Sequence, residues 1–161
     1  MKASENLPEP LLFIKAIHEA GVKYLLIGRQ AVIAYGGPIQ TMDYDIYIDG
    51  SEENTNKLLD IALDFGLTPN LPKEELRKTF KFKLENEIVV DVFRARTLSS
   101  PKTGKIEFSK LYENKVIAKD RSGLSINLPS IDDLILLKKL RSSPKDTLDI
   151  RYLEKIKQQS L

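Results

Sequence analysis

Asp43 and Asp45 are the first residues in this sequence whose type and spacing suggest chemistry. They alternate with apolar residues over 42–49, so an extended strand would point both carboxylates to one face, about 6.6 Å apart along the chain. Two like charges at this spacing favour a cation between them. A lone Asp-x-Asp pattern is also typical of the solvent-facing side of an amphipathic strand, so the pair alone does not identify a site.

Asp91 strengthens the case because it interrupts the apolar run 88–93, which predicts a central strand buried on both sides. A carboxylate in such a strand needs a partner, since an unpaired buried ion strongly destabilises a fold. Arg94 and Arg96 are the nearby cations, but a regular strand would point Arg94 to the opposite face, and the direction of Arg96 is open. Side chains of a neighbouring strand could instead meet Asp91.

If the two predicted strands are neighbours, Asp43, Asp45 and Asp91 converge. Three carboxylates are enough to hold one or two Mg²⁺ or Mn²⁺ ions together with the phosphates of a nucleotide. Gly28, between a predicted strand at 23–27 and a predicted helix at 30–35, would let the backbone approach a phosphate near the amide donors of the helix. A lone glycine at such a junction is more often only a turn.

Composition limits the possible chemistry. The 161 residues include no cysteine and a single histidine, His18, which excludes thiolate zinc sites and clusters of several histidines, so any metal must bind mainly to oxygen ligands. The net charge of +2 gives no broad basic field for obligate nucleic-acid binding. No apolar run predicts a membrane span, and 1–10 lacks the pattern of a secretory signal. We therefore expect one domain, 1–161, in the cytoplasm and without a membrane partner.

Hydrophobic periodicity and turn residues predict an alternation of helices and strands. The predicted loop is 98–104, which is rich in serine, proline and glycine, and no internal repeat interrupts the pattern. Ser130 and Ser143 each open a Ser-x-x-Asp capping pattern, which predicts a helix after each. The predicted helices are 11–21, 30–35, 51–65 and the two that follow Ser130 and Ser143; the predicted strands are 23–27, 42–49, 79–84, 87–93, 115–119 and 124–128.

Two groups of motifs together resemble a known family. Gly28-Arg29-Gln30-Ala31-Val32, followed by Thr41-Met42-Asp43-Tyr44-Asp45 and then by Asp91, resembles the polymerase-beta-like nucleotidyltransferase superfamily. The stretches 133–138 and 144–149 look like the helical signature of its AbiE-type toxin branch and uncharacterised relatives. The resemblance implies an α+β nucleotidyltransferase fold with a mixed central β-sheet flanked by helices and a C-terminal helical pair.

The resemblance also implies an activity: transfer of a nucleoside monophosphate from a nucleoside triphosphate to a hydroxyl acceptor, which could belong to RNA, a protein or a small molecule. Mg²⁺ or Mn²⁺ would be the cofactor, and an antitoxin is a possible partner. Asp43, Asp45 and Asp91 would be the catalytic and metal-binding residues, with Asp91 activating the acceptor. The implied nucleotide-binding residues are Gly28, Arg29, Thr41, Lys138, Lys145 and Asp149.

This sequence departs from the family pattern at two points. Arg29 stands where the family usually has glycine or serine, and Ile39-Gln40 replaces an arginine that often precedes the Asp-x-Asp strand. Arg29 could bind phosphate, or it could fill the nucleotide pocket and mark a catalytically inactive nucleotide-binding or protein-interaction module. Considered on their own, Lys138 and Lys145 could equally be solvated lysines near the end of the chain.

Overall fold

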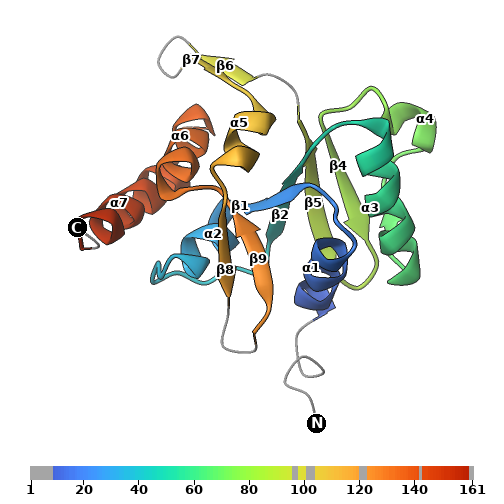
Figure 1. Ribbon diagram of the computed structural model, residues 1–161, viewed down its shortest axis with the longest axis horizontal. Coiled ribbons are helices and arrows are strands. Elements are labelled where there is room, and N and C mark those ends of the chain that lie inside the picture. Colours follow the sequence, from blue (N-terminus) through green and yellow to red (C-terminus); the bar gives the residue numbers. More distant parts are fainter. Residues whose placement is uncertain (1–8, 96–97, 101–103, 120–122, 142, 160–161) are drawn as a thin grey trace.

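A mixed β-sheet forms the centre of the protein in the computed structural model, which describes residues 9–95, 98–100, 104–119, 123–141 and 143–159 (Figure 1). Five strands lie in the order β1-β2-β5-β4-β3. The central pair, β2 and β5, is parallel, and every other neighbouring pair in this sheet is antiparallel. The predicted mixed sheet is confirmed. The strands are β1 (Tyr24–Ile27), β2 (Tyr44–Ile48), β3 (Thr68–Pro69), β4 (Lys81–Glu85) and β5 (Val89–Arg94).

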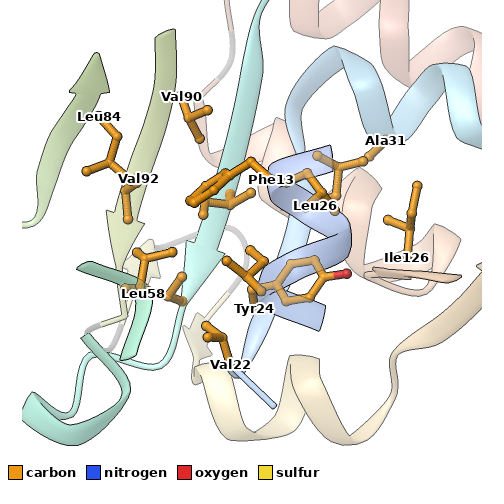
Figure 2. Close-up of a cluster of buried hydrophobic side chains, with 14 of the residues drawn as sticks. Phe13, Val22, Tyr24, Leu26, Ala31, Leu58, Leu84, Val90, Val92 and Ile126 are labelled. Atoms are coloured by element: carbon orange, nitrogen blue, oxygen red, sulfur yellow. The ribbon is translucent and has the colours of Figure 1, made fainter. Parts of the chain in front are cut away.

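The main hydrophobic core covers one face of this sheet. Alternate residues of the two central strands, such as Ile46 and Val92, point to this face and are fully buried. Phe13 of α1 (Glu9–Glu19) and Leu58 of α3 (Glu52–Asp64) pack against them. Figure 2 shows Phe13, Leu58 and Val92 in one cluster. Helical spacing of apolar residues on both helices predicted this packing.

The opposite face of β2 is also covered, which argues against the alternative interpretation of the Asp-x-Asp pattern as a solvent-facing side. Tyr47 is buried among Leu25, Phe108 and Leu111, and its ring stacks on that of Phe108 with centroids 5.3 Å apart. This cover comes from α5 (Phe108–Glu113), which the sequence did not predict. Before it lie β6 (Leu98–Ser100) and β7 (Gly104–Ile106), which pair antiparallel. The loop predicted over 98–104 was therefore wrong at 98–100 and 104, and 101–103 lie outside the described residues.

The hairpin expected near 115–128 is confirmed. It consists of β8 (Val116–Lys119) and β9 (Ser125–Leu128), which pair antiparallel. Asn127 of β9 ties this hairpin to the central sheet, because its backbone N–H donates to the Tyr24 hydroxyl at 3.1 Å and its side-chain amide donates to the Tyr24 carbonyl. Burial raises the pKa of Tyr24 to about 12, so this hydroxyl remains a neutral hydrogen-bonding group.

The C-terminal helices are α6 (Ile131–Arg141) and α7 (Pro144–Gln159), which lie side by side in Figure 1. Both predicted caps are present: the N–H of Asp133 donates to Ser130 Oγ at 3.1 Å, and Ser143 exchanges hydrogen bonds with Asp146. α7 also contacts α2 (Gly28–Ala34), the short helix after β1. A further helix, α4 (Lys73–Leu76), was not predicted. In the described residues, no helix has the length and apolarity to cross a membrane.

Candidate active site

Asp45 and Asp91 lie opposite each other at the centre of the sheet. Asp45 of β2 is the direct register partner of Asp91 of β5, and both are half-buried. In parallel neighbours, register partners point to the same face, so the two carboxylates share one site. This is the predicted meeting of the two strands, and it places the pair on the face opposite the main core.

The described residues neutralise the carboxylate pair only in part. Burial, followed by the negative charge of Asp91 and a hydrogen bond with it, raises the pKa of Asp45 from 3.8 to about 6. Arg141 opposes this effect, and Asp43 adds to it. Asp91 Oδ1 is buried and accepts no hydrogen bond from the described residues. A buried carboxylate oxygen without a donor is unusual in a folded protein and is consistent with a site that receives a cation.

Arg94 is not the partner of Asp91. Its guanidinium donates to the backbone carbonyls of Leu76 and Gly50, the second at 2.9 Å. These contacts hold the end of β5 to α4 and to the start of α3, on the face opposite Asp91. The expected direction of Arg94 is therefore confirmed. Arg96, the other candidate cation, lies outside the described residues.

Gly28 lies against Asp45. Its backbone has φ of +70°, a conformation that favours glycine, and a Cβ at this position would collide with the Asp45 carboxylate. Gly28 follows Ile27, the register partner of Asp45 across β1 and β2. Ile27 provides no side-chain cap for α2, which begins at Gly28. The missing side chain therefore lets the Asp45 carboxylate lie close to the backbone of Gly28.

Asp43 and Thr41 belong to the segment before β2 rather than to the strand itself. β2 begins at Tyr44, so the alternation predicted over 42–49 holds only from that residue onward, and Asp43 is exposed. The N–H of Asp43 donates to Thr41 Oγ1 at 3.1 Å, and Gln30 donates to the Thr41 carbonyl at 3.2 Å. Within the described ranges, no three acidic or histidine side chains form a ready metal cluster. Of the three predicted metal-binding carboxylates, Asp45 and Asp91 are the two that lie opposite each other on adjacent strands.

A buried ion network joins α2, α6 and α7. Asp149, with no exposed surface, accepts from Arg29 Nη2 at 3.1 Å and from Lys138 Nζ at 3.0 Å. Lys138 Nζ also lies 3.6 Å from Asp146 Oδ1. Three of the residues predicted to bind nucleotide therefore contact one another, and Lys138 is a buried ion rather than a solvated one. Lys145, at the start of α7, is exposed.

A cavity of about 300 Å³ lies beside the carboxylate pair, between the sheet and α6. Tyr47 and Phe93, which line it, are register partners two residues beyond Asp45 and Asp91, so they continue the same face of the sheet. The sequence did not identify these aromatic residues as part of a site. The other lining residues are Ile27, Gly28, Phe80, Leu134, Leu137, Lys138, Leu140, Arg141 and Asp146.

Arg141 is a charged residue of this site that the sequence analysis missed. It lies at the end of α6, lines the cavity, and lowers the pKa of Asp45 through its positive charge. In the sequence it is one of several basic residues in the last turn of a helix, a position that is usually explained by the helix dipole. Only the contact between α6 and the sheet distinguishes it from Lys139.

No protein-family model matches the sequence. No curated protein matches it either. Similar solved structures include the lincosamide antibiotic adenylyltransferase LnuA with lincomycin bound, at 22% identity and a TM-score of 0.64, covering 94% of this chain and 99% of that chain. A proposed nucleotidyltransferase from Thermotoga maritima is 18% identical, with a TM-score of 0.63 and 96% of each chain covered.

The antibiotic-resistance factor ANT(2'')-Ia is a third similar structure. It is 16% identical, with a TM-score of 0.62, covering 98% of this chain and 89% of that chain. Another structure of ANT(2'')-Ia contains adenylyl-2''-tobramycin. At these identities the likeness shows the fold alone: the chain has the nucleotidyltransferase fold that the sequence motifs predicted. The AbiE-type branch stays a prediction.

Proposed function

We propose that this protein transfers a nucleoside monophosphate from a nucleoside triphosphate to a hydroxyl group. The observation that supports this most strongly is the Asp45–Asp91 pair, in which two carboxylates on adjacent strands face each other and Asp91 Oδ1 is buried without a donor among the described residues. Gly28 lies against Asp45 and lines the adjoining cavity. A fold shared with two antibiotic-modifying proteins is consistent with this chemistry.

A divalent cation fits the side chains of this site. Asp45 and Asp91 offer paired oxygen ligands, and Asp43 lies two residues before Asp45, in the segment that leads into β2. Carboxylate oxygens are ligands that Mg²⁺ and Mn²⁺ accept readily. When bound, such an ion would neutralise negative charge on the phosphates and on the attacking and leaving oxygens. It would also relieve the repulsion that raises the pKa of Asp45.

The residues of the chain would act mainly by positioning groups and by moving one proton. Asp91 would accept the proton of the acceptor hydroxyl as its oxygen bonds to the α-phosphorus. The bond from that phosphorus to the bridging oxygen would break, and pyrophosphate would leave. Asp45 would hold the reacting groups opposite Asp91, and Gly28 would let the triphosphate approach the backbone. The hydroxyl proton passes to Asp91 and the negative charge of the broken bond leaves with pyrophosphate, so atoms and charge balance in this single displacement.

A small molecule is the acceptor that the cavity favours. Its lining is mostly aliphatic and aromatic, with Tyr47, Phe80 and Phe93 beside the carboxylate face, as expected for a pocket that encloses a compact organic group. LnuA with lincomycin, and ANT(2'')-Ia with adenylyl-2''-tobramycin, hold small molecules on the same fold. An extended RNA or protein acceptor would need a longer open surface, and a toxin role with an antitoxin is supported only by the C-terminal motif.

Arg29 favours a second candidate function, a nucleotide-binding module without turnover. Its guanidinium is committed to Asp149, beside Gly28, at a position where the resemblance expects a small residue. Calorimetry with Mg²⁺ and each triphosphate separates the two functions. Binding that is lost in Asp45→Ala but yields no pyrophosphate would support the module and contradict the enzyme.

Pyrophosphate release tests the enzyme directly. The wild-type protein should release pyrophosphate from at least one ribonucleoside triphosphate when Mg²⁺ and a pool of small hydroxyl compounds, including lincomycin and tobramycin, are present. Loss of a general base typically costs about 10²–10⁴-fold in rate, so Asp91→Asn should fall by that amount. Asp60→Asn, which removes an exposed carboxylate from α3, is the control. Full activity in Asp91→Asn would refute the proposed role.

A further inference from the structure

Two basic side chains line the cavity from neighbouring turns of one helix. Lys138 and Arg141 are three residues apart on α6, so they face the same side of that helix. A triphosphate at the carboxylate pair would need at least one cation to balance its charge in addition to a metal. The Lys138 side chain is buried and the Arg141 side chain is exposed, so the two differ in their availability to a ligand.

The charge of Lys138 is already neutralised by protein. Its side chain is 5% exposed, and its Nζ lies 3.0 Å from Asp149 Oδ2 and 3.6 Å from Asp146 Oδ1. If Lys138 turned toward a phosphate, the fully buried Asp149 would keep only Arg29 as a partner. Breaking a buried pair leaves an uncompensated charge, which is strongly unfavourable. Lys138 therefore suits a structural role.

Arg141 is in the opposite situation. Its side chain is 65% exposed, and its Nε lies 3.7 Å from Asp146 Oδ2, which is longer than a hydrogen bond. Its guanidinium can therefore turn without leaving a buried carboxylate unpaired, because Asp146 also accepts from Ser143. The planar fork of arginine matches the oxygens of a phosphate in a two-pronged contact.

We propose that Arg141 binds the phosphates of the nucleotide, and that Lys138, with Asp149 and Arg29, forms a structural clamp between α2 and the C-terminal helices. The proposal builds on the proposed function, because it names the cation that acts at the same site. It reassigns the phosphate contact that the sequence resemblance gave to Lys138 and Lys145. Arg141 lines the cavity beside the carboxylate pair. Lys145 is exposed, and the described residues that line this cavity do not include it.

Magnesium tripolyphosphate is a suitable probe because it carries the phosphates without a base whose identity is unknown. Its affinity is measured by calorimetry for the wild type, Arg141→Gln, Arg141→Lys and Lys145→Gln. Arg141→Gln should bind about 10–100-fold more weakly, the effect of losing a hydrogen bond to a charged group. Arg141→Lys should recover part of the loss, because it restores the charge but not the fork. Lys145→Gln, the matched control, should bind like the wild type.

Each outcome bears on the proposal. Unchanged affinity in Arg141→Gln, or an equal loss in Lys145→Gln, would overturn the role of Arg141 and leave the proposed function standing. Binding that depends on Arg141, without pyrophosphate release from any triphosphate, would support the phosphate site and count against the enzyme. Absence of tripolyphosphate binding by the wild type would overturn the role of Arg141, whereas the proposed function would fall only if no triphosphate yielded pyrophosphate. Thermal unfolding of Lys138→Gln tests the clamp, which predicts a lower melting temperature than that of Arg141→Gln.

Discussion

Asp45 and Asp91 are direct register partners on the adjacent parallel strands β2 and β5, so their carboxylates share one face of the sheet. The two residues are 46 positions apart in sequence, and the parallel pairing of their strands is what brings them together. Gly28 lies against Asp45 and also lines the cavity between the sheet and α6.

Divalent metal should stabilise the protein through the carboxylate pair. A ligand that binds only the folded state at about 100 times its Kd adds about 2.7 kcal/mol to the free energy of unfolding, or about 5–10 °C in Tm for a chain of this size. Differential scanning calorimetry with and without MnCl₂ measures the shift. We expect Asp45→Asn to lose it and the remote Asp60→Asn to keep it. An equal shift in both variants would place the metal elsewhere.

The stability of the metal-free protein should depend on pH through Asp45. The pKa of this carboxyl is raised from 3.8 to about 6 in the folded state, chiefly by burial and by the charge of Asp91. The folded state therefore holds a proton that the unfolded state has released. The contribution of this proton to the free energy of unfolding is complete below pH 3.8 and is lost as pH rises through about 6.

Urea denaturation in EDTA, compared between the wild type and Asp45→Asn, isolates the contribution of the carboxylate pair, because titrating groups remote from the pair affect both proteins equally. We expect the variant to gain stability relative to the wild type as pH rises through that window and to keep a constant advantage above it. A difference that is flat with pH, or that shrinks as pH rises, would show that Asp45 is already neutralised in the folded protein.

Gly28→Ala should be more destabilising than Gly21→Ala. Both glycines have positive φ, +70° and +78°, so each alanine carries the backbone strain of a left-handed conformation, about 1–2 kcal/mol. At position 21 the added methyl group meets nothing within 4 Å, whereas at position 28 it meets the Asp45 carboxylate. Chemical denaturation of the two variants measures the difference. Equal losses of stability would show that the Asp45 carboxylate can move away from the added methyl group without destabilising the fold.

Asp149→Asn should be strongly destabilising, because it removes the fully buried carboxylate that pairs with Arg29 and is the nearer of the two partners of Lys138. Breaking a buried ion pair in this way typically costs about 3–5 kcal/mol. Asp132→Asn, which breaks the exposed pair with Lys157, is the control and should cost less than about 1 kcal/mol. Urea denaturation of both variants tests the clamp, and similar small losses would contradict it.

The sequence predicted the central strands because their patterns are local. Alternation of polar and apolar residues identified β2, and an apolar run identified β5. Asp91 interrupts that run, so its carboxylate was expected to need a partner, which a neighbouring strand could provide. The C-terminal helices followed from the caps at Ser130 and Ser143. Each of these signals spans only a few residues. The pairing of β2 with β5, which brings Asp45 to Asp91, is a long-range contact and was a condition of the predicted site.

Long-range contacts explain what the sequence did not predict. Arg29 and Asp149 are separated by 120 positions, and nothing in either segment indicates that they pair. Lys138 was therefore assigned to phosphate or to solvent, although it is buried between two carboxylates. The predicted loop at 98–104 had turn-forming composition, yet its ends pair as β6 and β7 before α5, which covers Tyr47.

A crystal of the protein grown with Mn²⁺ and a non-hydrolysable nucleoside triphosphate tests the central claim most directly. Anomalous scattering should place manganese between the Asp45 and Asp91 carboxylates, with the triphosphate beside Gly28. Manganese bound elsewhere, or Asp91 in contact with a protein cation and no metal at the pair, would contradict the account.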